Sequence, residues 1–184
     1  MHADFTKKRF IIAGGGTGGH LFPAIAISET LQDLGARIHF VGSKYGLESN
    51  ILSKRQLEHT LLNIRGFSRQ ISIRSVFRNI LFPLRFIISF IKSYFLLKDF
   101  KPHAVIGTGG YSSGLPLLSA VLLSIPTLIH EQNSFPGITT RKLASKVNIV
   151  CLATPDSAKY LDIENYVITG NPVRKSIRKI IKID

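Results

Sequence analysis

The sequence is poor in the residues that build disulfide and metal frameworks. It has one cysteine, one methionine and no tryptophan. A lone cysteine excludes an internal disulfide and a zinc site built from several thiolates. Cys151 lies in an apolar run over residues 147–152, which predicts a buried residue of a strand. We therefore assign no metal ligand and no cofactor to this chain.

The amino-terminal residues lack the pattern of a secretory leader. Residues 1–9 are few and largely polar, and a glycine-rich loop interrupts the apolar segment that follows them. A secretory leader needs a continuous apolar region behind a basic start. The sequence therefore favours a cytoplasmic location.

Acidic residues are also scarce, and this shortage gives the chain a large positive charge. Aspartate and glutamate total 11 against 24 lysines and arginines, so the net charge is +13. Such an excess is typical of proteins that bind nucleic acid, an anionic membrane surface or phosphate-bearing substrates. The sequence has no helix-turn-helix or zinc pattern and no aromatic arrangement suited to base stacking. Of these partners we therefore exclude nucleic acid.

Apolar segments of strand length alternate with longer amphipathic segments along the 184 residues. We predict strands over residues 9–13, 37–41, 60–64, 104–108, 127–130, 147–152 and 166–169. We predict helices over residues 23–34, 47–55, 76–98, 115–124, 139–145 and 155–161. This alternation predicts a single Rossmann-like α/β domain, a parallel sheet with helices on both faces.

The most informative segment is a glycine-rich loop between a predicted strand and a predicted helix. Residues 11–20 read Ile-Ile-Ala-Gly-Gly-Gly-Thr-Gly-Gly-His. The backbone N–H groups of such a loop, with the positive end of the following helix dipole, can hold a phosphate. His20 ends the loop and can move a proton near neutral pH. Pro23 is expected as the first helical residue, where its missing N–H costs nothing.

Three interpretations of this loop compete. Its glycine spacing matches the dinucleotide-binding fingerprint, but that fingerprint also needs a carboxylate at the end of the second strand. The second strand here ends in residues 42–44, Gly-Ser-Lys, which contain no carboxylate. A nucleotide P-loop needs lysine and then serine or threonine after the last glycine, where this chain has His20 and Leu21. A tight turn without a ligand is the third interpretation, and a second copy of the pattern weakens it.

The second copy follows the predicted strand over residues 104–108. Residues 107–114 read Gly-Thr-Gly-Gly-Tyr-Ser-Ser-Gly and precede a predicted helix. Ser112 and Ser113 are candidates to cap that helix. Both loops would lie at the carboxyl ends of parallel strands, where such sheets bind ligands. Two phosphate-binding loops at one edge indicate a diphosphate, or a phosphate with a sugar beside it.

Two further polar segments follow predicted strands. Residues 130–133 read His-Glu-Gln-Asn. Capping and turn formation alone would explain Asn133, although residues at strand ends of these sheets often contact ligands. Residues 169–174 read Thr-Gly-Asn-Pro-Val-Arg, which forms a turn by itself. Arg174 is either an anion ligand or part of the basic carboxyl-terminal tail.

The apolar stretch over residues 80–97 is almost long enough to span a bilayer. Arg85 and Lys92 interrupt it, and each would cost about 2.5–3.5 kcal/mol at the membrane centre. Together with Arg78 they share one helical face. An apolar stripe occupies another part of the helix and consists of Ile80, Leu84, Ile87, Ile91 and Phe95. The pattern favours either a core-packed helix with a solvated basic face or a helix in the plane of the membrane interface.

In their order and spacing, the four polar and glycine-rich segments resemble the signatures of the MurG family. The resemblance runs from about Arg9 to Arg174. It implies one half of a glycosyltransferase of GT-B fold. Members of this family transfer GlcNAc from UDP-GlcNAc to the muramyl 4-hydroxyl of lipid I, with inversion at the sugar, and so form lipid II for peptidoglycan. They act as peripheral proteins on the cytoplasmic face of the inner membrane.

The resemblance also implies roles for individual residues. His20 is the first candidate for the base that takes the proton of the acceptor hydroxyl, and Glu131 is the second. Glycine backbone would face the acceptor diphosphate, while other residues would line the UDP-GlcNAc cleft. The implied substrate-binding residues are Thr17, Gly18, Gly19, Gly109, Gly110, Ser112, Asn133 and Arg174.

Members of the family have two domains, which sets the expected organisation of this chain. We expect residues 1–170 to form the amino-terminal acceptor-binding domain and residues 171–184 to begin the interdomain linker, with the carboxyl-terminal donor domain absent. The implied partners are UDP-GlcNAc, undecaprenyl-diphosphate-linked muramyl pentapeptide and an anionic membrane surface. A second interpretation stays open, in which the chain is a non-catalytic, membrane-associated subunit that binds acceptor and recruits a separate donor-domain chain.

Overall fold

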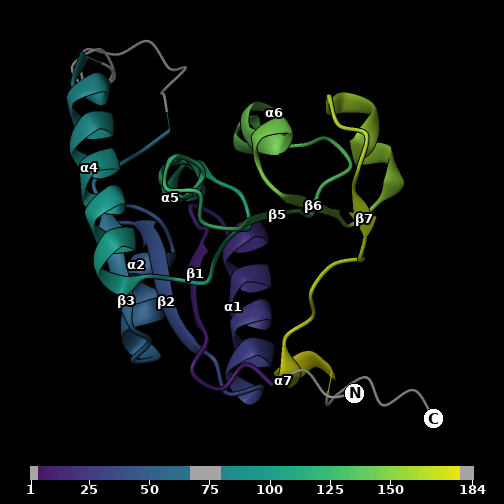
Figure 1. The fold of residues 1–184 in the computed structure, drawn as a ribbon, viewed down its shortest axis with the longest axis horizontal. Coiled ribbons are helices and arrows are strands. Elements are labelled where there is room, and N and C mark those ends of the chain that lie inside the picture. The colour runs from purple at the N-terminus through teal and green to yellow at the C-terminus, as the bar shows by residue number, and fades with distance from the viewer. Residues whose placement is uncertain (1–3, 67–79, 179–184) are drawn as a thin grey trace.

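A computed structural model describes residues 4–66 and 80–178. Its seven strands form one parallel sheet in the order β3-β2-β1-β4-β5-β6-β7 (Figure 1). The strands are β1 (Arg9–Ala13), β2 (Arg37–Ser43), β3 (His59–Leu62), β4 (Ala104–Gly107), β5 (Thr127–Glu131), β6 (Ile149–Leu152) and β7 (Val167–Ile168).

Helices follow most of these strands. The α-helices are α1 (Gly18–Asp33), α2 (Glu48–Lys54), α4 (Phe82–Phe100), α5 (Tyr111–Leu122), α6 (Ile138–Leu143) and α7 (Lys175–Arg178). Two 3-10 helices, η1 (Ala144–Lys146) and η2 (Pro155–Tyr160), flank β6.

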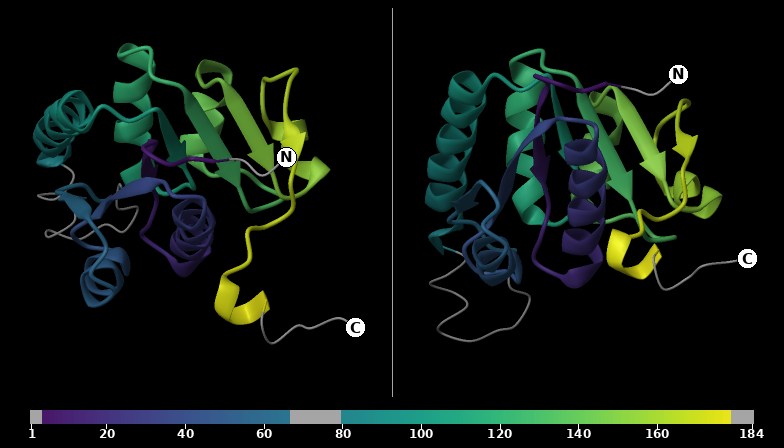
Figure 2. Two further views of the ribbon diagram at one scale, coloured as in Figure 1. Left: turned by 60° about the horizontal axis from the view of Figure 1, so that its bottom comes forward. Right: turned by 90° about the horizontal axis from the view of Figure 1, so that it is seen from below.

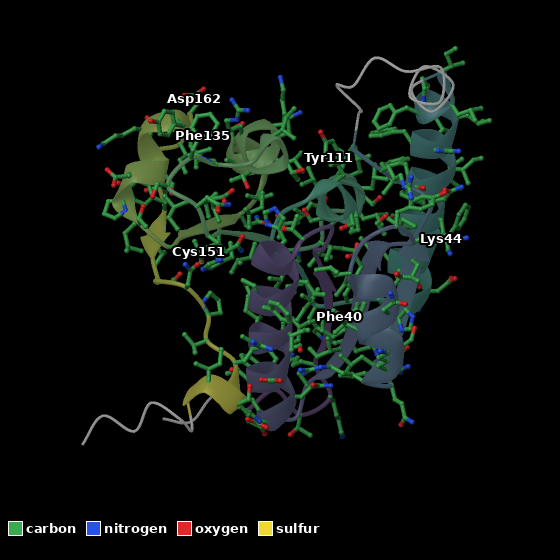
Figure 3. The ribbon with its side chains drawn as sticks, turned by 180° about the vertical axis from the view of Figure 1, so that it is seen from behind. Phe40, Lys44, Tyr111, Phe135, Cys151 and Asp162 are labelled. Atoms are coloured by element: carbon green, nitrogen blue, oxygen red, sulfur yellow. The ribbon has the colours of Figure 1, made fainter. Side chains whose placement is uncertain are left out.

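Helices cover both faces of the sheet. Successive residues of its central strands point to opposite sides, and each side packs against helices. Ile11 of β1 packs in a cluster with residues of α4 and α5, while its neighbour Ile12 packs with residues of α1 and α2. Figure 2 shows these two helix layers on either side of the sheet, and Figure 3 shows Phe40 in the packed interior beside α1. The predicted Rossmann-like fold is therefore confirmed.

Two helices begin earlier than the sequence pattern predicts. Helix α1 begins at Gly18, so Pro23 lies inside the helix rather than at its first position, and that prediction is wrong. Helix α5 begins at Tyr111 with Gly110 as its N-cap. Ser112 is therefore in the first turn and does not cap the helix. Glycine and serine have poor helix propensity, so their presence hid both first turns.

The strand order changes direction beside β1, and this brings the two glycine loops together. Strand β1 pairs with β2 on one side and with β4 on the other. The chain therefore leaves β1 and β4 at the same edge of the sheet and on adjacent strands. Open parallel sheets bind their ligands at such a switch point.

Helix α4 places its small polar residues inward and its apolar stripe outward. Its buried residues are Ser89, Ser93 and Leu97, and α5 packs directly against it. The exposed apolar residues of this segment are Ile80, Leu81, Leu84, Ile87, Ile88, Ile91 and Phe95. The helix does pack against the core, through Leu97 and phenylalanines that include Phe86 and Phe90, but the predicted apolar stripe faces outward. The predicted start of this helix at residue 76 and Arg78 lie outside the described residues.

Over residues 4–66 and 80–178, no helix combines the length and the apolar character that crossing a bilayer requires.

After β7 the chain turns back towards α1. Gly170 adopts a positive φ of 67°, and α7 then lies beside the end of α1 (Figure 1). The Lys175 N–H donates to Glu29 at 3.2 Å, and the Lys175 ammonium pairs with Asp33. These contacts fix the segment that follows the sheet along one side of α1.

Candidate functional site

A cleft of about 620 Å³ opens at the carboxyl ends of the first four strands in the sheet order. The first turns of α1 and α5 both contribute to it, with Thr17 and Tyr111 among the lining residues, and Figure 3 shows Tyr111 at the start of α5. Helix N-termini carry unpaired N–H groups and a partial positive charge. Arg65 also lines the cleft, and its guanidinium stacks 3.8 Å from the centre of the Tyr45 ring. The arrangement suits an anion.

The two glycine loops interlock beside this cleft. The Thr108 hydroxyl donates to the His20 carbonyl at 2.8 Å, and a side chain at Gly14 would collide with that hydroxyl. A side chain at Gly110, which has a φ of 78°, would collide with the Gly15 carbonyl. Glycine is therefore required where the loops touch, for space as well as for backbone conformation.

His20 lies between the two loops, in the first turn of α1. Its Nδ1 is 3.0 Å from the Thr108 carbonyl oxygen and 3.2 Å from Oε1 of Gln132. Gly109 makes room for the ring, since a Cβ there would stand 2.5 Å from Nδ1. Both neighbours of Nδ1 are acceptors, so Nδ1 carries the proton of the neutral ring. Nε2 is then the basic atom.

A buried carboxylate holds the first glycine loop through hydrogen bonds to its backbone. Glu48 is fully buried and accepts two backbone hydrogen bonds, from Gly16 at 2.8 Å and from Ser43 at 2.7 Å. It therefore ties the loop to the end of β2. The dinucleotide fingerprint expects a carboxylate near this strand end, but the Glu48 oxygens face the protein backbone rather than a ligand.

Glu131 is held by four donors, which leaves it little freedom to act as a base. One oxygen accepts from the backbone and side-chain amides of Asn133, and the other accepts from the Gly137 N–H and the Thr140 hydroxyl. The residue is 1% exposed. Its contacts shape the turn after β5 and hold Asn133 at the surface.

Of the remaining predicted site residues, Thr17 and Ser112 line the cleft, whereas Arg174 does not. Thr17, the N-cap of α1, makes no capping bond with its side chain. The Ser112 hydroxyl is buried in the cleft wall and has no partner among the described residues. Arg174 instead lies outside the cleft, with its guanidinium 4.1 Å from the centre of the Phe22 ring. Phe22 in turn lies against Gly18, so Arg174 approaches α1 from the side of the segment after β7.

Sequence reasoning missed several residues of this site. The residues around Glu48 in the sequence do not indicate its role, because its hydrogen-bond partners belong to the first glycine loop and to the end of β2. Tyr45 and Arg65 follow β2 and β3, and their position after predicted strands was the only available indication. Gln132 was part of a recognised motif, but its contact with His20 depends on the adjacency of β4 and β5.

Fold and site together define a class of protein. The parallel sheet, its strand order and the paired glycine loops at its switch point match the Rossmann-like half of a solved GT-B glycosyltransferase. The model of the glycosyltransferase family 28 N-terminal domain matches residues 10–152. The chain belongs to this family.

Curated relatives agree with this assignment. The chain is 42% identical over 177 residues to the UDP-N-acetylglucosamine--N-acetylmuramyl-(pentapeptide) pyrophosphoryl-undecaprenol N-acetylglucosamine transferase of Caldanaerobacter subterraneus subsp. tengcongensis, covering 95% of this chain and 48% of that protein. It is 42% identical over 166 residues to the enzyme of the same name from Bacillus pumilus, covering 89% of this chain and 44% of that one. The chain thus spans about half the length of the curated relatives it matches.

Solved structures show the same architecture. Acinetobacter baumannii MurG superimposes with a TM-score of 0.72 at 27% identity, over 96% of this chain and 50% of that chain. Staphylococcus aureus MnaA in complex with UDP superimposes with a TM-score of 0.66 at 17% identity, over 97% of this chain and 49% of that chain. The second similarity concerns the fold alone.

Proposed function

We propose that this chain is the acceptor-binding half of an inverting glycosyltransferase that moves GlcNAc from UDP-GlcNAc to lipid I, giving lipid II for peptidoglycan. The observation that carries this proposal is the position of His20 between two interlocked glycine loops, in the lining of a cleft whose groups suit an anion. The names of the curated relatives support the substrates. The fold provides half of the two-domain enzyme that such a reaction needs.

In the proposed reaction, the muramyl 4-hydroxyl of the acceptor attacks the anomeric carbon of GlcNAc. The bond from that carbon to the UDP oxygen breaks, UDP leaves with the electron pair, and the configuration inverts. His20 Nε2 takes the hydroxyl proton, because Nδ1 is already protonated and held by Thr108. General-base catalysis of this kind contributes about 10²–10⁴-fold to a rate.

The glycine loops bind the acceptor diphosphate in this proposal. Gly18 and Gly19 present the first N–H groups of α1, and Gly109 and Gly110 present backbone from the second loop. The hydroxyls of Thr17 and Ser112, at the same cleft, donate to phosphate oxygens. Asn133 bonds a hydroxyl of the donor sugar, and Arg174 contacts an anionic group of the donor. Glu131 acts as a positioning residue that holds Asn133.

The domain organisation follows from the same proposal. Residues 1–170 form the acceptor domain, and residues 171–184 begin the connection to a donor domain that supplies most of the UDP-GlcNAc contacts. We expect the purified chain alone to transfer no GlcNAc to lipid I, and transfer to appear when a donor domain of a relative is supplied. The measurement is formation of radiolabelled lipid II. Ordinary turnover by the chain alone would contradict the proposal.

Failure of transfer with every supplied donor domain would favour the other interpretation. The chain would then be a non-catalytic subunit that binds lipid-linked acceptor. Retained binding of lipid I, measured in the same preparations, would separate that outcome from a misfolded chain.

We further propose that α4 places the chain on the cytoplasmic face of the membrane as a peripheral protein. Its apolar stripe is exposed, with Leu84 and Phe95 each 56% accessible. Lys92, also on α4, is exposed, and its ammonium donates to the Leu61 carbonyl at 3.2 Å. Exposed aliphatic residues beside basic ones are typical of helices that bind an anionic lipid surface.

Binding to anionic vesicles is expected to weaken as salt rises, since ions screen exposed charges. Replacing Arg78, Arg85 and Lys92 with glutamine should weaken it further, by about fivefold for each residue, because a basic residue near such a surface contributes about 1 kcal/mol. Co-sedimentation with phosphatidylserine vesicles measures the effect. Lys54→Gln, on the opposite face of the sheet, is the matched control. Salt-independent binding, or equal loss in the control, would contradict the proposal.

A further inference from the structure

A continuous chain of hydrogen bonds leads from His20 to the segment that leaves the sheet. His20 Nδ1 contacts Oε1 of Gln132 at 3.2 Å. The Gln132 amide nitrogen contacts Nδ1 of His130 at 3.0 Å. His130 Nε2 contacts the Gly170 carbonyl oxygen at 3.0 Å. The two histidines and the glutamine thus connect the glycine loops with the point where the chain turns towards α7.

The donors and acceptors along this series of hydrogen bonds determine which nitrogen carries each proton. The Gly170 carbonyl can only accept, so His130 Nε2 carries a proton and donates it. His130 Nδ1 then accepts from the Gln132 amide, whose nitrogen also donates to the His130 carbonyl at 2.9 Å. With both of its N–H groups committed to His130, the Gln132 amide must turn its oxygen towards His20. That oxygen accepts the proton of His20 Nδ1.

A protonated His130 would break this order, because its Nδ1–H would face the amide N–H of Gln132. Burial holds the pKa of His130 below its ordinary value, against the opposing effects of the Gly170 carbonyl and the Glu131 charge. The neutral ring that the hydrogen bonds require is therefore also the ring that its surroundings favour.

We propose that Gln132 is a positioning residue that selects the Nδ1–H tautomer of His20, and that His130 orients Gln132 from the Gly170 carbonyl. The hydrogen-bond partner of one imidazole nitrogen decides which nitrogen is left as the base. Without Gln132, the one acceptor that the described residues leave to Nδ1 is the Thr108 carbonyl. The importance of this tautomer for catalysis rests on the proposed role of His20 as base, whereas the tautomer itself can be measured in this chain.

The test is the nitrogen NMR spectrum of the ¹⁵N-histidine-labelled 184-residue chain, at a pH where histidine is neutral. In the unaltered chain we expect His20 protonated at Nδ1 and His130 protonated at Nε2. Gln132→Leu should shift the His20 tautomer ratio towards Nε2–H by about 2- to 10-fold, which is the effect of losing one neutral hydrogen bond. His130→Phe, which keeps a ring but no nitrogen, should shift His20 in the same direction.

Two further variants make the result decisive. Gln132→Glu keeps an oxygen for His20 Nδ1 but cannot donate to His130, so it should preserve the His20 signature and change that of His130. Gln32→Leu, at an exposed position of α1, is the matched control and should change neither. An unchanged His20 ratio in Gln132→Leu, or in His130→Phe, would overturn the proposal. An intact signature in a chain that transfers no GlcNAc even when a donor domain is supplied would count against the proposed function alone.

Discussion

Replacing His20 with alanine is expected to lower the turnover number of the complex restored with a donor domain by about 10²–10⁴-fold. His20 Nε2 is the basic atom of the ring, because Nδ1 faces the Thr108 carbonyl and Oε1 of Gln132. The substitution removes the proton acceptor and leaves the glycine backbone in place. Acceptor binding should therefore weaken far less than turnover. Steady-state transfer assays at saturating and limiting lipid I separate the two effects.

The matched control is His103→Ala, just before β4 and away from the cleft, where the ring accepts the Arg9 N–H. It should leave turnover close to that of the unaltered chain. Turnover that survives His20→Ala nearly intact would make His20 a structural residue and would contradict its role as the base. A collapse of acceptor affinity with unchanged turnover at saturation would make His20 a binding residue.

Glu48→Ala is expected to lower the free energy of unfolding by about 1.5–4.5 kcal/mol. The substitution leaves the N–H groups of Gly16 and Ser43 without their acceptor. The Ser43 group is buried, so its loss costs about 1–3 kcal/mol, and the loss at the exposed Gly16 adds about 0.5–1.5 kcal/mol. The first glycine loop should loosen at the same time, since its tie to the end of β2 is gone. Urea denaturation followed by circular dichroism measures the change in stability.

Glu48→Gln provides a second variant in case the alanine form does not fold. It keeps one acceptor oxygen but presents an amide N–H to the other backbone N–H, so its stability should lie between those of the alanine variant and the unaltered chain. The control is Glu164→Ala, at an exposed position. A Glu48→Ala midpoint equal to that of the control would show that the carboxylate does not hold the loop.

The central strands of this fold are predictable because their apolar runs are buried on both faces. Residues such as Ile11 and Ile12 point to opposite helix layers, so every position of the run must be apolar. Both glycine loops were recognisable for a similar reason, since each follows such a run directly. The order of the strands then brings the loops together at the switch point.

The parts that escaped prediction depend on contacts between distant segments. The inward face of α4 could not be chosen from periodicity, because Ser89 and Ser93 face inward beside phenylalanines of the helix, while other large apolar residues face outward. The contact between Gln132 and His20 joins the ends of β5 and the first turn of α1. Local sequence carries no information about such pairs.

The contact between the two glycine loops limits how either loop can be replaced, in engineered chimeras and in evolution. Because Gly110 touches the Gly15 carbonyl and Gly14 touches the Thr108 side chain, neither loop tolerates a bulkier residue while the other keeps its shape. A chimera that exchanges one loop with that of a distant homologue should therefore fold poorly, whereas one that exchanges both should fold well. The two segments behave as a single unit of substitution, although more than eighty residues of chain separate them.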